Sequence, residues 1–217
     1  MDKNFLIIGL GRFGRHTARK LNSLGGQIMA VDKNEERVEA ALKFVTSAQI
    51  GDSTNWDFIS SLGVRNFDVC IVAIGDDFLA SLETTSYLKE LGAKKVVARA
   101  ARDMQRKFLL RNGADDVVYP ERDMGNWTAV RYSSENIFDY MQLDGDNGIF
   151  EITVPVNWTG KTIGELDVRS HYQINIMAVK SADHMDIVTD ADYMLQLGQT
   201  LVVLGKTQDV HKLLNAK

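Results

Sequence analysis

Three glycines after a short apolar run carry the clearest chemical signal in this sequence. The run at 5–8 is typical of a strand buried in a parallel sheet. In a strand-turn-helix unit, Gly9 allows a tight turn, Gly11 lets the backbone approach a phosphate and Gly14 lets the helix pack on the strand. The N-terminus of that helix offers unpaired N–H groups and a favourable dipole to an anion. The spacing therefore predicts a phosphate-binding loop.

The chain beyond this loop supports the same interpretation. Apolar residues recur at helical spacing from 13 to 24, and a second apolar run at 28–31 ends at Asp32. Asp32 lies 18 residues beyond Gly14, close to the offset of roughly 20 residues at which an acidic side chain binds a ribose. The alternative is a structural turn followed by a surface aspartate. The combined pattern favours a nucleotide or dinucleotide site.

Composition excludes several other classes of protein. The chain has 217 residues and a net charge of −4, which gives no general electrostatic reason to bind nucleic acid or a membrane surface. No run of 18 apolar residues is present, so we expect no direct membrane insertion. The first strand begins almost at the N-terminus and leaves no room for a signal peptide. We therefore expect a cytoplasmic protein.

No catalytic constellation stands out elsewhere. The single cysteine, Cys70, lies in a buried-strand pattern and is expected in the core. The four histidines lack metal-ligand spacing, and the polar cluster Asp183 to Asp186 is better explained as a hairpin turn. No nucleophile motif is present. We therefore do not expect an enzyme.

The first part of the chain alternates between strand and helix patterns, which predicts an α/β fold with a Rossmann-like doubly wound parallel sheet. Ligands bind at the carboxyl ends of the strands in such sheets. Asp52 follows a strand, so it either contacts a bound base or ribose or caps the helix expected from about Thr54. The expected strands are 5–8, 28–31, 47–50, 67–73, 94–98 and 117–119, and the helices after the first are 35–44, 54 onward, 78–91, 102–112 and 121–132.

The second part of the chain no longer alternates regularly between strand and helix patterns. Residues 136–143 have the spacing of an amphipathic helix, and the polar segment 144–148 is typical of a linker. We therefore expect a nucleotide-binding domain at 1–143, including crossover helices, and a small α+β domain at 144–217. The strands expected in the small domain are 149–155, 174–179, 185–188 and 200–204, and its helices are 162–171 and 209–214.

Six segments together carry a family resemblance: Ile8 to Gly14, Ala30 to Asp32, Phe67 to Gly75, Tyr119 to Gly125, Gly160 to Arg169 and Gly198 to Gly205. The chain resembles the cytosolic regulatory subunits of bacterial Ktr/Trk potassium uptake systems, which consist of an RCK (TrkA-N) domain and a TrkA-C domain. The resemblance implies a non-catalytic gating subunit that binds ATP or ADP. It also implies a homo-oligomer, an octameric ring of dimers, that lies against the membrane through a separate potassium pore subunit.

The resemblance also implies roles for individual residues. Arg12 would reach the nucleotide phosphates, Arg99 would lie near them, and Glu121 would help to hold a divalent cation, Mg²⁺ or Ca²⁺. The small domain would bind cyclic di-AMP through Asp167, Val168, Arg169, Ile174, Asn175 and Ile176. The candidate nucleotide-binding residues are Gly9, Gly11, Arg12, Phe13, Gly14, Asp32, Lys33, Asp52, Ser53, Ala73, Ile74, Gly75 and Arg99.

Two other functions fit part of the sequence. An NAD(H)-binding sensor or NAD-linked oxidoreductase would use the same glycine loop and Asp32. A dehydrogenase also needs an acid-base group beside a substrate pocket, and the small domain offers only isolated histidines. A transcriptional redox sensor would need a basic DNA-reading segment, which the sequence lacks.

Overall fold

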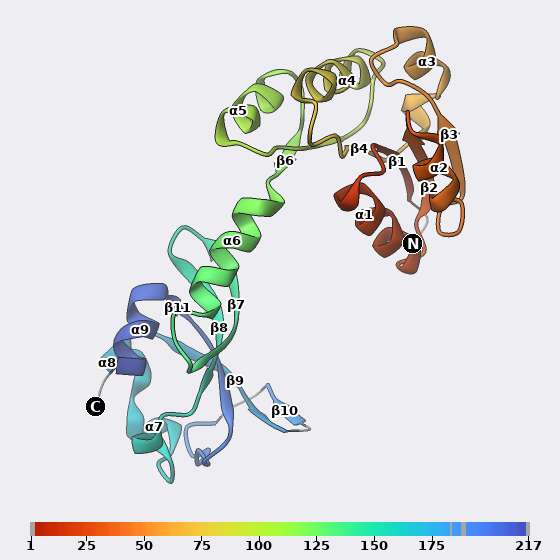
Figure 1. Ribbon diagram of the computed structural model, residues 1–217. Coiled ribbons are helices and arrows are strands. Elements are labelled where there is room, and N and C mark those ends of the chain that lie inside the picture. The colour runs from red at the N-terminus through yellow and green to blue at the C-terminus, as the bar shows by residue number, and fades with distance from the viewer. Residues whose placement is uncertain (1–2, 183, 188–189, 216–217) are drawn as a thin grey trace. The chain divides into compact units, whose positions relative to one another are not determined.

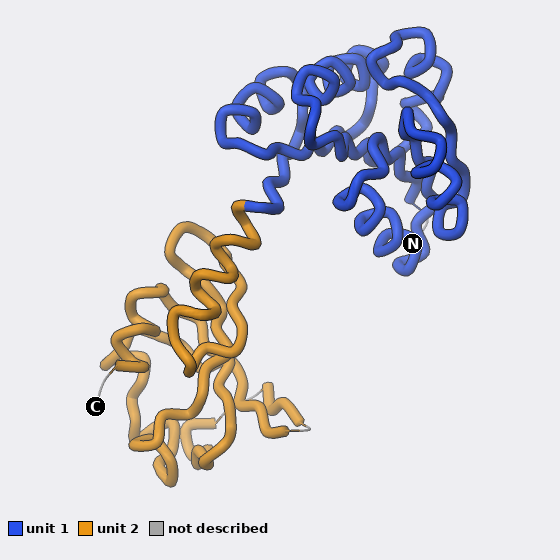
Figure 2. The backbone as a smooth tube through the Cα atoms, in the orientation of Figure 1, with its two compact units in different colours: residues 1–121 blue, residues 122–217 orange. Residues whose placement is uncertain are grey.

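The computed structural model describes residues 3–182, 184–187 and 190–215. The chain divides into two compact units, residues 1–121 and 122–217 (Figure 2). The sequence placed the division later, between 143 and 144. The difference arises because residues 137–144 form a strand of the second sheet, so they and the helix before them belong to the second unit.

Unit 1 contains the predicted parallel sheet. Its strand order is β3-β2-β1-β4-β5-β6, and every neighbouring pair is parallel. The chain reverses its direction of winding between β1 and β4, and ligands of open α/β sheets bind at such a switch point. The strands are β1 (Asn4–Ile8), β2 (Gln27–Asp32), β3 (Ser47–Ile50), β4 (Val69–Val72), β5 (Val96–Arg99) and β6 (Asp116–Val118).

Helices cover both faces of this sheet (Figure 1). Alternate side chains of β1 explain how: Phe5 and Ile7 pack in the cluster that contains Ala18 of α1. Leu6 and Ile8 pack in the opposite cluster, with side chains of α3, α4 and α5. The helices are α1 (Arg12–Ser23), α2 (Glu35–Ala41), α3 (Trp56–Ser61), η1 (Val64–Asn66), α4 (Phe78–Glu90) and α5 (Asp103–Arg111), and α6 (Pro120–Arg131) leads into unit 2.

Unit 2 is the expected α+β domain, built on an antiparallel sheet of order β10-β9-β11-β8-β7. Its core lies on one face, where Phe150 and Leu201 of the sheet pack with Val210 of the last helix. The strands are β7 (Ile137–Asp144), β8 (Asn147–Thr153), β9 (Asn175–Ser181), β10 (His184–Asp186) and β11 (Thr200–Lys206); the helices are η2 (Val156–Trp158), α7 (Ile163–Leu166), α8 (Val168–Tyr172) and α9 (Thr207–Asn215).

The helix expected at 136–143 was wrong, because this segment is strand β7. The register of β7 against β8 shifts between Ile137 and Asp139. The shift places the next core residue, Tyr140, three positions after Ile137, whereas a regular strand would bring every second residue inward. A spacing of three is what an amphipathic helix shows. Residues 144–148, expected as a linker, contain the hairpin turn between β7 and β8.

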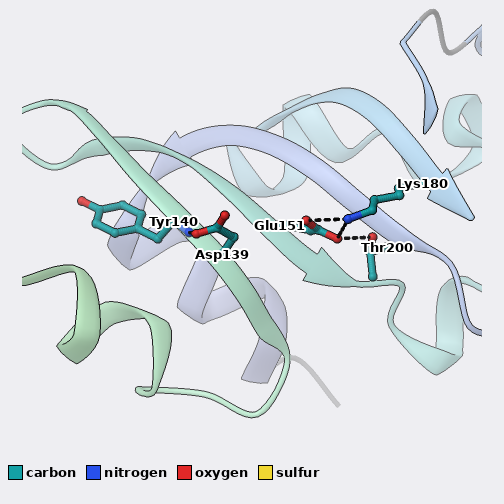
Figure 3. Close-up of polar contacts among 5 residues, drawn as sticks. All are labelled: Asp139, Tyr140, Glu151, Lys180 and Thr200. Atoms are coloured by element: carbon teal, nitrogen blue, oxygen red, sulfur yellow. Dashed lines mark hydrogen bonds and ion pairs between the residues drawn. The ribbon is translucent and has the colours of Figure 1, made fainter. Parts of the chain in front are cut away.

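The other face of this sheet carries an ion pair. Glu151 of β8 accepts hydrogen bonds from Lys180 of β9 at 2.9 Å and from Thr200 of β11 at 2.9 Å (Figure 3). The three side chains join three strands of the sheet, and Phe150 and Ile152 on either side of Glu151 point into the core.

Two smaller segments also differ from expectation. The helix expected at 162–171 is broken into α7 and α8 at Asp167, whose φ of +38° is left-handed. The segment expected as a hairpin turn at 183–186 is strand β10 from His184 to Asp186, which pairs antiparallel with β9, and Asp183 lies outside the described residues. The strand expected at 185–188 extends only to Asp186, and residue 188 lies outside the described part of the chain.

Candidate functional site

A cavity of about 780 Å³ lies at the carboxyl ends of the strands in unit 1. It is lined by the loops that follow β1, β2, β3 and β4, by the end of β5 and by the start of α6. Every residue that the sequence suggested for nucleotide binding lines this cavity except Gly14, and Glu121 lines it too. Residues spread over more than 100 positions therefore meet at one site.

The glycine loop forms one wall, and its glycines meet different needs. Gly9 has a φ of +96°, which favours glycine. A Cβ atom on Gly14 would lie 1.9 Å from the carbonyl oxygen of Gly9, so this glycine allows α1 to pack on the loop without itself lining the cavity. A Cβ atom on Gly11 would meet nothing within 4 Å. The backbone at Gly11 is therefore open to a ligand.

Asp32 holds the loop to the end of β2. Its carboxylate is buried and accepts hydrogen bonds from the backbone N–H of Leu10 at 2.6 Å and of Asn34 at 2.9 Å. The guanidinium of Arg37 lies 3.7 Å from the same carboxylate. Asp32 lines the cavity, where the carboxylate of this fingerprint meets a ribose.

The beginning of α1 is suited to an anion. Gly11 is its N-cap and provides no side-chain hydrogen bond, and the first turn contains no acidic residue. The N–H groups at this end therefore remain available, and the helix dipole is uncompensated. Arg12, at the first helical position, is exposed and has no ion pair within the described ranges, and Lys33 lines the same cavity. These groups can bind a phosphate together.

Arg99 and Glu121 form an ion pair beside the glycine loop. The guanidinium of Arg99 lies against Gly75, where a Cβ atom would come within 1.8 Å of it, and its central carbon is 5.9 Å from the centroid of the Phe13 ring. Gly75 therefore leaves the space that Arg99 occupies. All four residues line the cavity.

Asp52 and Ser53 contribute differently from each other. Asp52 accepts hydrogen bonds from the backbone N–H of Thr54 at 3.0 Å and from its hydroxyl at 2.8 Å, and these bonds lower the pKa of Asp52 below its ordinary value. The N-cap of α3 is Asn55, so the helix-capping alternative for Asp52 was wrong. Ser53 is buried, and its hydroxyl lies 2.8 Å from that of Thr84.

Sequence reasoning missed several residues of the cavity. His16 lies four positions after Arg12, a spacing that places both on one face of α1 and that could have revealed it. Arg37 follows Lys33 at the same spacing. Asp77 lines the cavity and caps α4 by accepting a hydrogen bond from the N–H of Ala80 at 3.0 Å.

Metal ligands are sparse in the described ranges. No three His, Cys, Asp or Glu side chains there gather closely enough to hold an ion. Glu121 contributes a single carboxylate, which forms an ion pair with Arg99. A divalent cation at Glu121 would therefore need further ligands, such as nucleotide phosphates.

The stretch suggested for cyclic di-AMP surrounds α8 in unit 2. The side chains of Val168 and Ile174 are buried in the core, so neither is available to a ligand in this conformation. Asp167, Arg169 and Asn175 are exposed, and Ile176 is half-buried.

Comparisons with known proteins agree with this architecture. The TrkA-N domain family matches residues 5–120, and the TrkA-C domain family matches residues 149–217. The chain is 38% identical to Ktr system potassium uptake protein C of Bacillus subtilis over 98% of this chain and 96% of that protein. It is 35% identical to Ktr system potassium uptake protein A of the same organism, over 99% and 96%.

The chain belongs to the family of Ktr system potassium uptake proteins. Members of this family are non-catalytic, and so is this chain. Among solved structures, the GsuK channel has the same fold, with a TM-score of 0.70 and 20% identity over 99% of this chain and 39% of that chain. The chain thus corresponds to less than half of the channel. None of the helices described in this Ktr protein is long and apolar enough to cross a membrane.

Proposed function

We propose that this chain is the nucleotide-sensing regulatory subunit of a Ktr-type potassium uptake system. The unit 1 cavity binds ATP and ADP, and the bound nucleotide controls potassium flux through a separate membrane subunit. The observation that carries the proposal is the meeting of the glycine loop, the uncapped N-terminus of α1 and the exposed Arg12 in one cavity. A nucleoside phosphate matches this set, since its phosphates suit the cations and its ribose suits Asp32.

The family supplies the rest of the proposal. Subunits of this chain form a homo-oligomeric ring of dimers, in the cytoplasm, on the inner surface of the pore subunit. A divalent cation held by Glu121 and the phosphates assists nucleotide binding. Cyclic di-AMP binds unit 2 through the exposed side chains of Asp167, Arg169 and Asn175.

NAD(H) remains the competing ligand. The same loop and Asp32 suit a dinucleotide, and one structure of similar fold is the GsuK channel bound to NAD, with a TM-score of 0.68 and 20% identity over 96% of this chain and 38% of that chain. Another is GsuK bound to ADP, with a TM-score of 0.55 and 19% identity over 63% of this chain and 36% of that chain. At this identity both establish the fold alone.

A substitution of Arg12 tests whether the site distinguishes ATP from ADP. A nucleotide shifts a protein between two states only by its difference in affinity for them, and the terminal phosphate of ATP offers Arg12 one more charged contact than ADP does. We expect Arg12→Ala to raise the Kd for ATP by about tenfold or more and the Kd for ADP by much less. Calorimetric titration of the full chain measures both.

Lys20→Ala is the matched control, because it removes a positive charge from the exposed last turn of α1, away from the cavity. It should leave both affinities unchanged. Equal losses of ATP and ADP affinity in Arg12→Ala would remove Arg12 from the sensing role.

A further inference from the structure

Arg99 is the most confined cation of the cavity. Its side chain is 18% exposed, its guanidinium lies against Gly75, and its central carbon is 5.9 Å from the centroid of the Phe13 ring. Its Nε atom is buried and has no hydrogen-bond partner in the part of the chain that the structure describes. Because most of this side chain is enclosed, it presents a well-positioned positive charge to the cavity.

Glu121 supplies the counter-charge from a more open position. Its side chain is 57% exposed, it pairs with the guanidinium of Arg99, and it also lines the cavity. It is the second residue of α6, which begins at Pro120 and carries the chain from unit 1 into unit 2. The carboxylate of Glu121 therefore already pairs with Arg99, the confined cation of the site.

We propose that Glu121 is an internal competitor of the ligand for Arg99, so that a phosphate group of the ligand displaces it. This inference rests on the proposed function, because it requires a phosphorylated ligand in the unit 1 cavity. Arg99 is mostly enclosed, so a phosphate that binds it meets Glu121 beside the same guanidinium. Either the carboxylate moves away or two anions lie side by side, and both cost binding free energy.

Displacement of Glu121 gives the site a link to the rest of the chain. The carboxylate lies on the first turn of α6, the segment in which the chain crosses between the units. A ligand phosphate that takes Arg99 removes an ion pair anchoring that turn to β5. Glu121 thereby lowers the affinity for the ligand. Its release from Arg99 when the ligand binds also removes a contact of the first turn of α6.

The test is ADP binding to the full chain with EDTA present, so that no divalent cation contributes. Glu121→Gln keeps the size of the side chain and removes its charge, and it should lower the Kd for ADP by about two- to fivefold, the range for a partly exposed ion pair. Glu90→Gln removes the same charge from an exposed site on α4 outside the cavity, and it should leave the Kd unchanged.

Repeating the Glu121→Gln substitution in Arg99→Ala protein separates competition for Arg99 from a general effect of charge. In Arg99→Ala protein, Glu121→Gln should no longer tighten ADP binding, because the contested cation is gone. Adenosine, which lacks phosphate, should bind wild-type and Glu121→Gln proteins equally.

Three results would overturn the inference. These are an unchanged or higher Kd for ADP in Glu121→Gln, a gain of the same size in the Arg99→Ala background, and an equal gain for adenosine. If ADP binds the wild-type protein normally, the proposed function survives each of them. If no variant binds any nucleotide while all remain folded, the inference and the proposed function fail together.

Discussion

Gly11 and Gly14 lie three residues apart, yet the structure gives them opposite surroundings. A methyl group on Gly14 would overlap the carbonyl oxygen of Gly9, whereas a methyl group on Gly11 would enter open space beside the cavity. The φ of −60° at Gly11 also suits an alanine. We therefore expect Gly14 to be needed for folding and Gly11 for access of a ligand.

We expect Gly14→Ala to lower the free energy of unfolding by about 2 kcal/mol or more, because α1 must move away from the loop. Gly11→Ala should change that free energy by less than about 0.5 kcal/mol and weaken ATP binding instead. Thermal unfolding and calorimetric titration of the two variants measure the contrast. Equal destabilisation by both substitutions would contradict these separate roles.

The sequence was informative where spacing determines the contact, as for Gly9, Gly14 and Asp32. It could not show that Asp32 would bind the N–H of Leu10, or that Glu121 would pair with Arg99. Such pairings depend on how loops from different strands meet, and no local pattern encodes that meeting. The resemblance to a known family, rather than spacing, indicated Arg99 and Glu121.

Among the elements, the loop before β6 shows how one carboxylate joins a helix to a strand. Asp115 accepts hydrogen bonds from the backbone N–H of Val96 in β5 at 2.6 Å and from Lys89 of α4 at 3.0 Å. Burial raises the pKa of Asp115, but the hydrogen bonds from Val96 and Lys89 outweigh it and hold the pKa below its ordinary value.

This lowered pKa predicts the sign of a pH effect. The folded chain binds a proton at Asp115 less readily than the unfolded chain does, so the contribution of Asp115 is complete above the unfolded pKa of about 3.9. It is lost as the pH falls through the lower, folded pKa. We expect Asp115→Asn to destabilise the protein at pH 7 and to matter progressively less below about pH 4.

Urea unfolding of both proteins between pH 7 and pH 3 measures this difference. Glu39→Gln is the control, because Glu39 is exposed on α2 and has no ion pair within the described ranges. A loss of stability in Asp115→Asn that stays constant down to pH 3 would show that charge at Asp115 is unimportant.

Strand β7 marks the limit of reasoning from periodicity. The central strands β1, β2 and β4 of unit 1 are mostly buried apolar runs, and all six strands were recognised with small errors at their ends. In β7 the irregular register brings Ile137 and Tyr140 inward with helical spacing, and only the pairing with β8 reveals a strand. The boundary predicted between 143 and 144 differs from the division after Glu121 because this strand and the helix before it group with unit 2.

At the scale of the whole molecule, the two units divide the proposed functions. Unit 1 holds the cavity and its cations, and unit 2 holds the stretch suggested for cyclic di-AMP. The fold class and the family were predictable from sequence, since motifs of both units are present. Assembly and the identity of the ligand involve other molecules, so they require measurement on the intact protein.

The most direct measurement is a calorimetric series on the full chain with ATP, ADP, NADH and cyclic di-AMP, each with and without Mg²⁺. We expect saturable binding of ATP and of ADP, mutual competition between them, and weaker binding of both in Gly11→Ala. NADH should bind less tightly than either, and cyclic di-AMP should bind without displacing ATP. Binding of NADH alone, or no binding of ATP and ADP to folded protein, would contradict the account.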